Sequence, residues 1–325
     1  MSQPGIVRRA RDLIGAARGW AERTLLWRVW ERMLENEFLD RSVALAAKAF
    51  VAFFPLVIVV AAFMPDEVRT SIFTSLTTRL GIGGRALADA KQAFATADDV
   101  RRATGLLGLL FAFFFASSFT TALQRVYLRA WRRPGGGGVT NYVRGPAWLA
   151  AILVSFALFG GLRRVLDGPA GTTLFLVANF AGAVVIWWLT ADVMLRGQVR
   201  RRVLVATGLI TGIAMTVYAA TAPLWMPEVV RNQQSQFGFF GVALALVTWF
   251  TGAAFCIVVG AAAGAVLAED TGILGRWTRG GGSVLRPGAA EPLAPPVRAP
   301  RLVDALGRPD DDTPQPESPT NERRR

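Results

Sequence analysis

The sequence predicts an all-α polytopic membrane protein with six transmembrane helices and additional interfacial amphipathic helices. Three observations indicate this fold class. The chain is 52% hydrophobic and 18% charged, whereas soluble domains carry about 25% charged residues. It contains six apolar stretches of the length that crosses a bilayer. Its arginines gather beside alternate stretches, as expected when positive segments stay on one side of the membrane.

The composition excludes several kinds of catalytic site. The 325 residues include no histidine and a single cysteine, Cys256, which lies within an apolar run. The chain therefore lacks the commonest general base and zinc ligand, and it cannot form an intramolecular disulfide. We expect a protein that is not an enzyme, with no cofactor and no metal site.

The net charge of +13 does not predict a nucleic-acid partner, because the arginines flank apolar spans instead of forming one basic face. The expected partners are the lipid bilayer and, through the Arg-rich cytoplasmic segments, its anionic headgroups. A homo-oligomer is also possible on this sequence.

Residues 1–41 form an Arg-rich segment without the short apolar region and small-residue cleavage site of a signal peptide. Within it, Trp20–Leu39 places Trp27, Trp30 and Leu34 on one helical face, which predicts an amphipathic helix. This helix would either lie among the lipid headgroups or pack on the cytoplasmic side of the protein itself.

The first predicted span is 42–64, a run that is apolar except for Lys48 and contains Pro55. The connection Pro65–Arg102 carries apolar residues every four positions and a glycine-rich break. Two short amphipathic helices are therefore expected there.

Five more spans complete a membrane domain at 42–268. Pro223 and Pro227 are expected to close the fifth span, with a short outer loop at Pro223–Gln236. A cytoplasmic, Pro-rich, disordered tail is expected over 269–325. The five spans are predicted at about Thr104–Gln124, Gly145–Leu162, Thr172–Val193, Val203–Thr221 and Phe237–Leu267.

The distribution of lysine and arginine predicts the orientation. Of the 36 such residues, 26 fall in the N-terminal segment, two alternate loops and the tail, and nine fall on the other side. The positive-inside rule then puts both termini in the cytoplasm of a bacterium, with the spans in its inner membrane.

Three places in the chain resemble the YihY/BrkB family of bacterial inner-membrane proteins, to which ribonuclease activity has also been ascribed. The start of the first span, from Ala46 to Pro55, is similar to that family's Ala-rich segment and Ser-Leu-Phe-Pro turn. Ala116 to Tyr127 resembles its Ala-Ser segment and following aromatic residue. The last span, with Phe237-Gly238, Gly241, Trp249 and Gly260-Ala261-Ala262, resembles its Tyr-Gly-x-x-Gly start, Trp centre and Gly-Ala-Glu end.

The resemblance covers roughly Glu31–Glu269 and implies the six-span fold. The chain departs from the family pattern at three positions: Ala52 replaces a serine, Lys48 replaces a small or aromatic residue, and Ala262 replaces an acid. No role of that acid in ion or substrate handling can therefore be transferred to this chain. The sequence does not favour ribonuclease activity, because it has no phosphate-binding loop and no cluster of metal ligands.

Lys48, Asp192 and Asn179 are the candidate residues of a substrate or ion pathway, since ionisable and polar groups inside spans usually mark function. Lys48 and Asp192 fall on the same side and could pair along a cytoplasm-facing cavity. Alternatively, Lys48 extends to the headgroups and Asp192 pairs with Arg196 four residues later. Asn179 would form a hydrogen bond between helices or contact a substrate.

A second group of residues is expected to serve structure. Pro55 would kink the first span or act as a gate, and Gly238 and Gly241 begin the last span. Gly260 and Gly264, like Gly208 and Gly212, have the spacing of close helix packing within the monomer or between copies.

The sequence thus predicts a plasma-membrane protein that performs membrane transport or lipid handling in the cell envelope without covalent catalysis. The alternative is a non-transporting membrane scaffold that recruits envelope partners. A wide cavity lined by Lys48, Asn179 and Asp192 would favour transport, and an exposed face of small residues would favour the scaffold.

Overall fold

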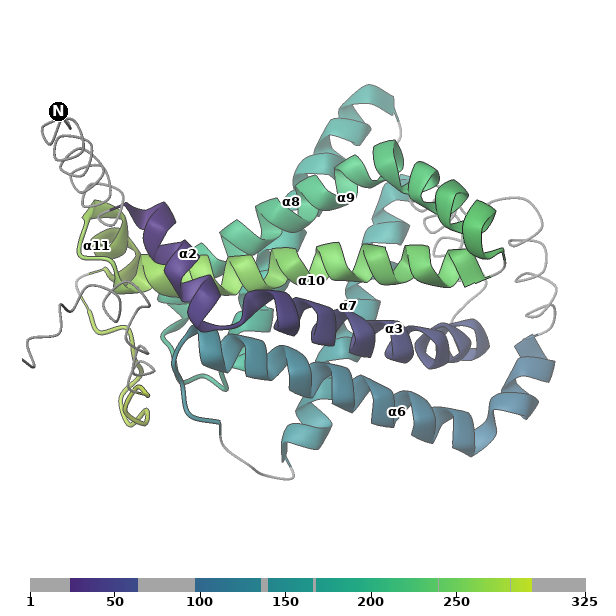
Figure 1. The fold of residues 1–325 in the computed structure, drawn as a ribbon, viewed down its shortest axis with the longest axis horizontal. Helices are drawn as coiled ribbons and strands as arrows, with labels where there is room; N and C mark the ends of the chain where they lie inside the picture. Colours follow the sequence, from purple (N-terminus) through teal and green to yellow (C-terminus); the bar gives the residue numbers. More distant parts are fainter. Residues whose placement is uncertain are drawn as a thin grey trace, which may run out of the picture. The chain divides into compact units, whose positions relative to one another are not determined.

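The computed structural model describes residues 24–63, 97–135, 140–165, 168–238, 240–280 and 282–293. Every extended regular element in this part of the chain is an α-helix (Figure 1), and Val199 and Leu285 form an isolated antiparallel bridge. The helices are α2 (Leu25–Glu35), α3 (Phe38–Phe63), α6 (Ala97–Ala130), α7 (Thr140–Val165), α8 (Gly168–Met194), α9 (Arg201–Phe237), α10 (Phe240–Glu269) and α11 (Ile273–Arg279).

Four of these helices are long and apolar enough to cross a membrane, counting only the described residues. These segments are Gly108–Ala130, Ala170–Met194, Arg201–Phe237 and Phe240–Glu269. The helices α3 and α7 each have 26 residues, which also exceeds the roughly 20 that a bilayer requires. The all-α membrane fold is confirmed, and the count of six spans stays a prediction.

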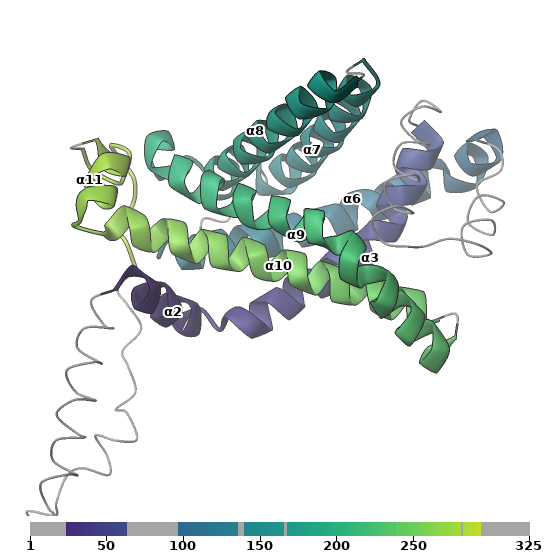
Figure 2. The ribbon, with the colours of Figure 1, turned by 90° about the horizontal axis from the view of Figure 1, so that it is seen from above.

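Helix α10 lies at the centre of the helical packing. It packs along α9 on one side and α3 on another, while α6 packs against α3 and α8 packs against α9. Helix α7 contacts α6 and α8, and Figure 2 shows α7 and α8 running side by side. Helices α6 and α8 therefore form a second layer, outside α3 and α9.

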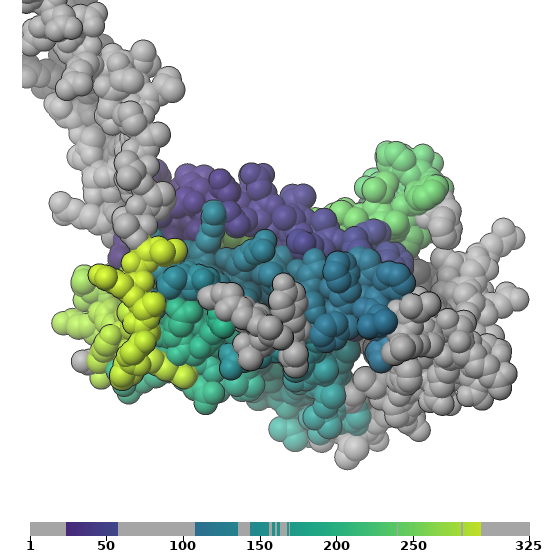
Figure 3. All heavy atoms as spheres, turned by 90° about the horizontal axis from the view of Figure 1, so that it is seen from below, coloured from purple at the N-terminus to yellow at the C-terminus, as the bar shows by residue number. Residues whose placement is uncertain are grey.

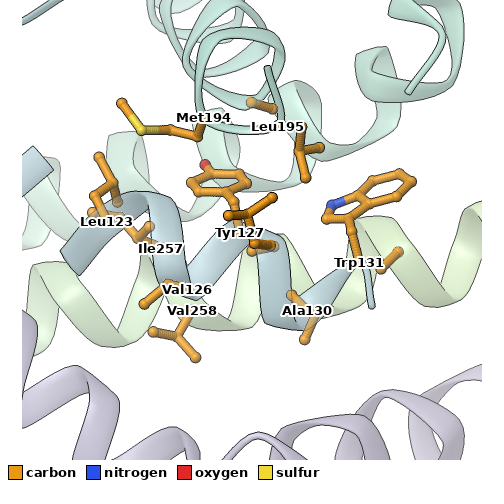
Figure 4. Packing of buried hydrophobic residues seen from close by; sticks show 14 of the residues in the cluster. Leu123, Val126, Tyr127, Ala130, Trp131, Met194, Leu195, Ile257 and Val258 are labelled. Carbon is orange, nitrogen blue, oxygen red and sulfur yellow. The ribbon is translucent and has the colours of Figure 1, made fainter. Parts of the chain in front are cut away.

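The main buried cluster lies where α6, α8 and α10 approach one another. Leu123 and Tyr127 of α6 are fully buried, as is Leu195 just after α8. Figure 4 shows the Tyr127 ring lying below Met194 and beside Ile257 of α10. Burial of large apolar side chains here stabilises one end of the helix bundle.

Helices α9 and α10 approach closely because glycines of α10 lie opposite threonines of α9. A Cβ atom on Gly260 would lie 2.1 Å from Thr211 Oγ1, and one on Gly264 would lie 2.0 Å from Thr207 Oγ1. Neither position accommodates a side chain in this packing. The Gly-x-x-x-Gly spacing thus serves a contact within the monomer in this structure.

A second glycine pair brings α9 equally close to α8. A Cβ atom on Gly208 would lie 2.8 Å from the Trp188 backbone, and one on Gly212 would lie 3.1 Å from Val184 Cα. Small residues therefore allow α9 to pack tightly against α8 and α10 simultaneously.

The predicted end of the fifth span at Thr221 is wrong. Helix α9 continues through Pro223 and Pro227 to Phe237, so the predicted outer loop Pro223–Gln236 is helical. Each proline removes one backbone hydrogen bond, but Met226 and Val230 on this stretch are buried against Leu246 of α10. This burial offsets the lost hydrogen bonds.

The predicted disorder of the tail is wrong for its first part. Helix α11 follows α10 directly, and residues 282–293 lie on the α8–α9 connection and the end of α6. We call residues 282–293 the C-terminal strap. Residues 294–325 and most of the predicted connection Pro65–Arg102 lie outside the described residues; 97–102 belong to α6.

Of the amphipathic segment predicted at Trp20–Leu39, α2 forms the larger part and Phe38 and Leu39 begin α3, while residues 20–23 lie outside the described residues. The chain turns at Glu37, whose φ is +51°, and α3 begins one residue later. Helix α3 therefore begins at Phe38, four residues before the predicted start of the first span. Its first turn contains the charged residues Asp40 and Arg41.

Candidate functional site

Arginines of α2 attach that helix to the end of α10. The Arg28 guanidinium lies 2.6 Å from Asp270, and Arg32 forms an ion pair with Glu269. Arg32 is 5% exposed and also donates to the Ala130 carbonyl oxygen of α6 at 2.8 Å. Since this contact brings together three helices, the charged face of α2 points into the protein.

Helix α2 buries Val29 and Met33 against the core and exposes a second apolar stripe. Leu26, Trp30 and Leu34 follow one another every four residues, and they are 83%, 47% and 54% exposed. The predicted alternative that α2 packs on the protein itself therefore holds for its Val29–Met33 side. Contact of the exposed stripe with lipid headgroups stays a prediction.

Lys48 lies on the outer surface of the bundle. Its side chain is exposed, and Nζ donates a hydrogen bond to Ser118 Oγ of α6 at 2.9 Å. Both residues lie within apolar helices, Lys48 ten residues after the start of α3. An exposed ammonium here requires polar or anionic partners, because lipid tails offer none.

Two arginines lie further along the same surface. Arg41 precedes Lys48 by seven residues and Arg125 follows Ser118 by seven, which is close to two helical turns in each helix. Arg41 is half-buried and pairs with Glu37 at 3.0 Å. Figure 3 shows this face, with α3 in purple beside α6 in blue. Arg125 is exposed and forms no ion pair with another described residue. We call Arg41, Lys48, Ser118 and Arg125 the α3–α6 polar track.

The Asp192 carboxylate forms ion pairs with two arginines. Its carboxylate oxygens accept hydrogen bonds from Arg201 Nε and from Arg286 Nη2 of the C-terminal strap, each at 2.9 Å. The predicted pair with Lys48 is therefore wrong. The prediction assumed a similar depth for both residues from their positions in the spans. In the structure they lie on helices with different main neighbours, because α3 packs on α6 and α10 whereas α8 packs on α9.

The other predicted residues lie in separate places. Asn179 is half-buried in the middle of α8, and Pro55 is half-buried inside α3, which continues beyond it. Gly238 caps α9 with φ +58°, and a Cβ atom on Gly241 would lie 2.4 Å from the Gln233 backbone. These two glycines allow the tight turn between α9 and α10.

A small polar cavity lies between α6, α7 and α8. Its volume is about 20 Å³, room for one or two water molecules. It is lined by Thr120, Thr121, Gln124, Arg144, Gly145, Val193 and Met194. This cavity is too small for an organic substrate, and Lys48, Asn179 and Asp192 do not line it.

Sequence reasoning missed Ser118 as the partner of Lys48 and Arg286 as a partner of Asp192. Both lie far away in the chain, 70 and 94 residues from their partners. The serines and threonines of the second span did signal hydrogen bonds between helices. Nothing in the sequence pattern indicated that Arg286 packs on α8.

Residues 29–276 match the family model described as virulence factor BrkB. No curated protein and no solved structure matches the chain.

Proposed function

Because the chain belongs to the YihY/BrkB family, we propose that it is a multi-pass plasma-membrane protein that handles anionic phospholipid without making or breaking covalent bonds. The observation that carries this proposal is the exposed Lys48 ammonium on the outer surface of α3, 2.9 Å from Ser118. An anionic headgroup supplies the partner that such a cation requires in a lipid environment.

The α3–α6 polar track suits a lipid that leaves its normal depth. Arg41 and Arg125 would meet phosphate groups in the headgroup layer, and Lys48 lies about 10 Å further along the helices. A phosphate that moves between these cations exchanges one favourable charge contact for another. The acyl chains would meanwhile contact the exposed apolar side chains of Val51, Phe54 and Phe114.

The orientation is part of the proposal. Arginines dominate the end of the bundle where α6, α8 and α10 finish, and the positive-inside rule puts such an end in the cytoplasm. The track then faces the inner leaflet, whose anionic lipids attract basic residues at about 1 kcal/mol per residue. Both termini of the membrane domain would be cytoplasmic, in a bacterial inner membrane.

Replacement of Lys48 should reduce the retention of anionic lipid. We expect Lys48→Ala to lower co-purifying phosphatidylglycerol about fivefold, which is the loss of about 1 kcal/mol of attraction. Native mass spectrometry of the protein released from nanodiscs of mixed phosphatidylglycerol and phosphatidylcholine measures this ratio.

The matched control is Arg231→Ala, which removes an exposed cation paired with Glu228 near the other end of α9. It should retain lipid like the parent protein. Equal phosphatidylglycerol retention by the Lys48→Ala and parent proteins would contradict the proposal.

A further inference from the structure

Arg133, just after α6, is a buried cation with an incomplete set of partners. It is 2% exposed. Its Nε donates to Gln198 Oε1 at 3.1 Å, and Nη2 donates to the Ala290 carbonyl oxygen of the C-terminal strap. Nη1 is buried without a hydrogen-bond partner among the described residues. Its two acceptors are thus neutral oxygens.

A buried guanidinium without an anionic partner is costly, because removal of a charge from water is offset only by opposite charge and complete hydrogen bonding. The same burial lowers the pKa of Arg133 below its usual value. Arginine binds planar or tetrahedral oxyanions with two parallel hydrogen bonds. An oxyanion would therefore satisfy both the charge and the unpaired Nη1.

The surroundings of Arg133 also carry excess positive charge. Arg201 and Arg286 share the single carboxylate of Asp192. The Arg200 side chain donates to the Ser283 carbonyl oxygen of the strap, at 3.4 Å. Several arginines near Arg133 thus have one carboxylate and a few carbonyl oxygens as partners. The resulting positive potential favours the approach of an anion.

The C-terminal strap covers Arg133 with few contacts. Arg200 N donates to Val284 O at 3.1 Å, Arg286 N to Gln198 O at 3.1 Å, and Leu293 N to the Arg132 carbonyl oxygen at 2.9 Å. The strap has few large apolar residues: Val284 packs partly buried against the core, and Leu293 is 53% exposed. Segments with so little apolar burial open at low free energy.

We propose that Arg133 forms the base of a binding site for a phosphate group, and that the C-terminal strap covers this site and opens when the phosphate binds. The Ala290 carbonyl oxygen holds the position that a phosphate oxygen takes in the bound state. The phosphate belongs either to a lipid headgroup or to a soluble phosphate compound. This site is separate from the α3–α6 polar track and does not depend on Lys48.

Hydrogen exchange of the full chain in nanodiscs tests this proposal. The amides of Arg286 and Leu293 report the strap, because both donate to other segments. In phosphatidylcholine nanodiscs with inorganic phosphate at ten times its dissociation constant, we expect about tenfold faster exchange of these amides. A second arm replaces added phosphate with phosphatidylglycerol in the nanodisc.

The two arms separate the sources of the phosphate. Acceleration only with phosphatidylglycerol identifies a lipid headgroup, and acceleration with inorganic phosphate identifies a site open to soluble compounds. Unchanged exchange in both arms overturns the proposal. Equal acceleration by chloride at the same ionic strength also overturns it, since that result is a general effect of salt on the Arg286–Asp192 ion pair.

Variants locate the response. Arg133→Gln should abolish the acceleration, whereas Arg129→Gln, four residues earlier and 55% exposed on its side chain, should retain it. If Arg133→Gln protein does not fold, Arg286→Gln is the second test, because it frees the strap from Asp192 and leaves Arg133 intact. It should raise basal exchange of Leu293 and shift the phosphate response to lower concentration; an unshifted response contradicts the proposal.

Discussion

Gly264→Ala should lower the thermal unfolding midpoint of the protein by roughly 10 °C, the effect of about 3 kcal/mol of overpacking. The added Cβ atom would lie 2.0 Å from Thr207 Oγ1 and 2.9 Å from the Thr207 Cα atom. A hydroxyl could rotate away, but the backbone contact forces α9 and α10 apart. Because these two helices form the largest interface in the bundle, their separation weakens the whole membrane domain.

The single cysteine supplies the measurement. Cys256 is half-buried on α10, so labelling by a thiol-reactive dye during heating reports the loosening of that helix. Gly161→Ala is the matched control, since a Cβ atom there meets nothing within 4 Å. It should leave the midpoint unchanged or slightly raised, as alanine favours helix over glycine. Equal midpoints for the two variants would show that the α9–α10 contact is looser than described.

Arg32→Ala should loosen the attachment of α2 to the membrane domain. The side chain is 6% exposed and pairs with Glu269, and it also bonds to the Ala130 carbonyl oxygen. Its removal leaves these acceptors without their donor, at about 3 kcal/mol. Helix α2 is also held by the Glu35–Arg132 ion pair at 2.8 Å and by buried Met33. The loss at Arg32 adds to the opening of the helix, so we expect the α2 amides to exchange faster by about a hundredfold in nanodiscs.

Two further arginines calibrate that result. Arg28→Ala removes a more exposed ion pair, with side chains 34% and 15% exposed, and should have a smaller effect on α2. Arg231→Ala removes a surface pair that is 74% and 61% exposed, and such pairs contribute about 0–1 kcal/mol. Comparable α2 exchange in all three variants would mean that burial of Arg32 does not anchor the helix.

The membrane fold could be predicted from the sequence because apolar length and arginine placement report on a bilayer directly. The same pattern located α3, α8 and α10 to within about four residues at both ends, whereas α6 runs from Ala97 to Ala130 and exceeds its predicted span at both ends. The prediction that Pro223 ends the helix was wrong. A proline removes one backbone hydrogen bond, but the apolar contacts of Met226 and Val230 with α10 keep this stretch helical.

The candidate site was harder to predict because pairing depends on lateral packing. The sequence predicted a similar depth for Asp192 and Lys48, but it did not show which helices pack together, and each residue binds a different partner. The strap was missed for another reason. It is attached through backbone hydrogen bonds and Arg286, which neither hydropathy nor proline content reveals.

We propose that the protein moves anionic phospholipid along the α3–α6 polar track. The most direct test uses proteoliposomes that carry fluorescent phosphatidylglycerol in both leaflets. A membrane-impermeant reductant quenches the label in the outer leaflet, and label in the inner leaflet is lost only as the lipid crosses the membrane. We expect faster loss from the inner leaflet with the parent protein and with Arg231→Ala than in protein-free liposomes, and no acceleration with Lys48→Ala. Identical rates with the parent protein and without protein, or with Lys48→Ala and the parent protein, would contradict it.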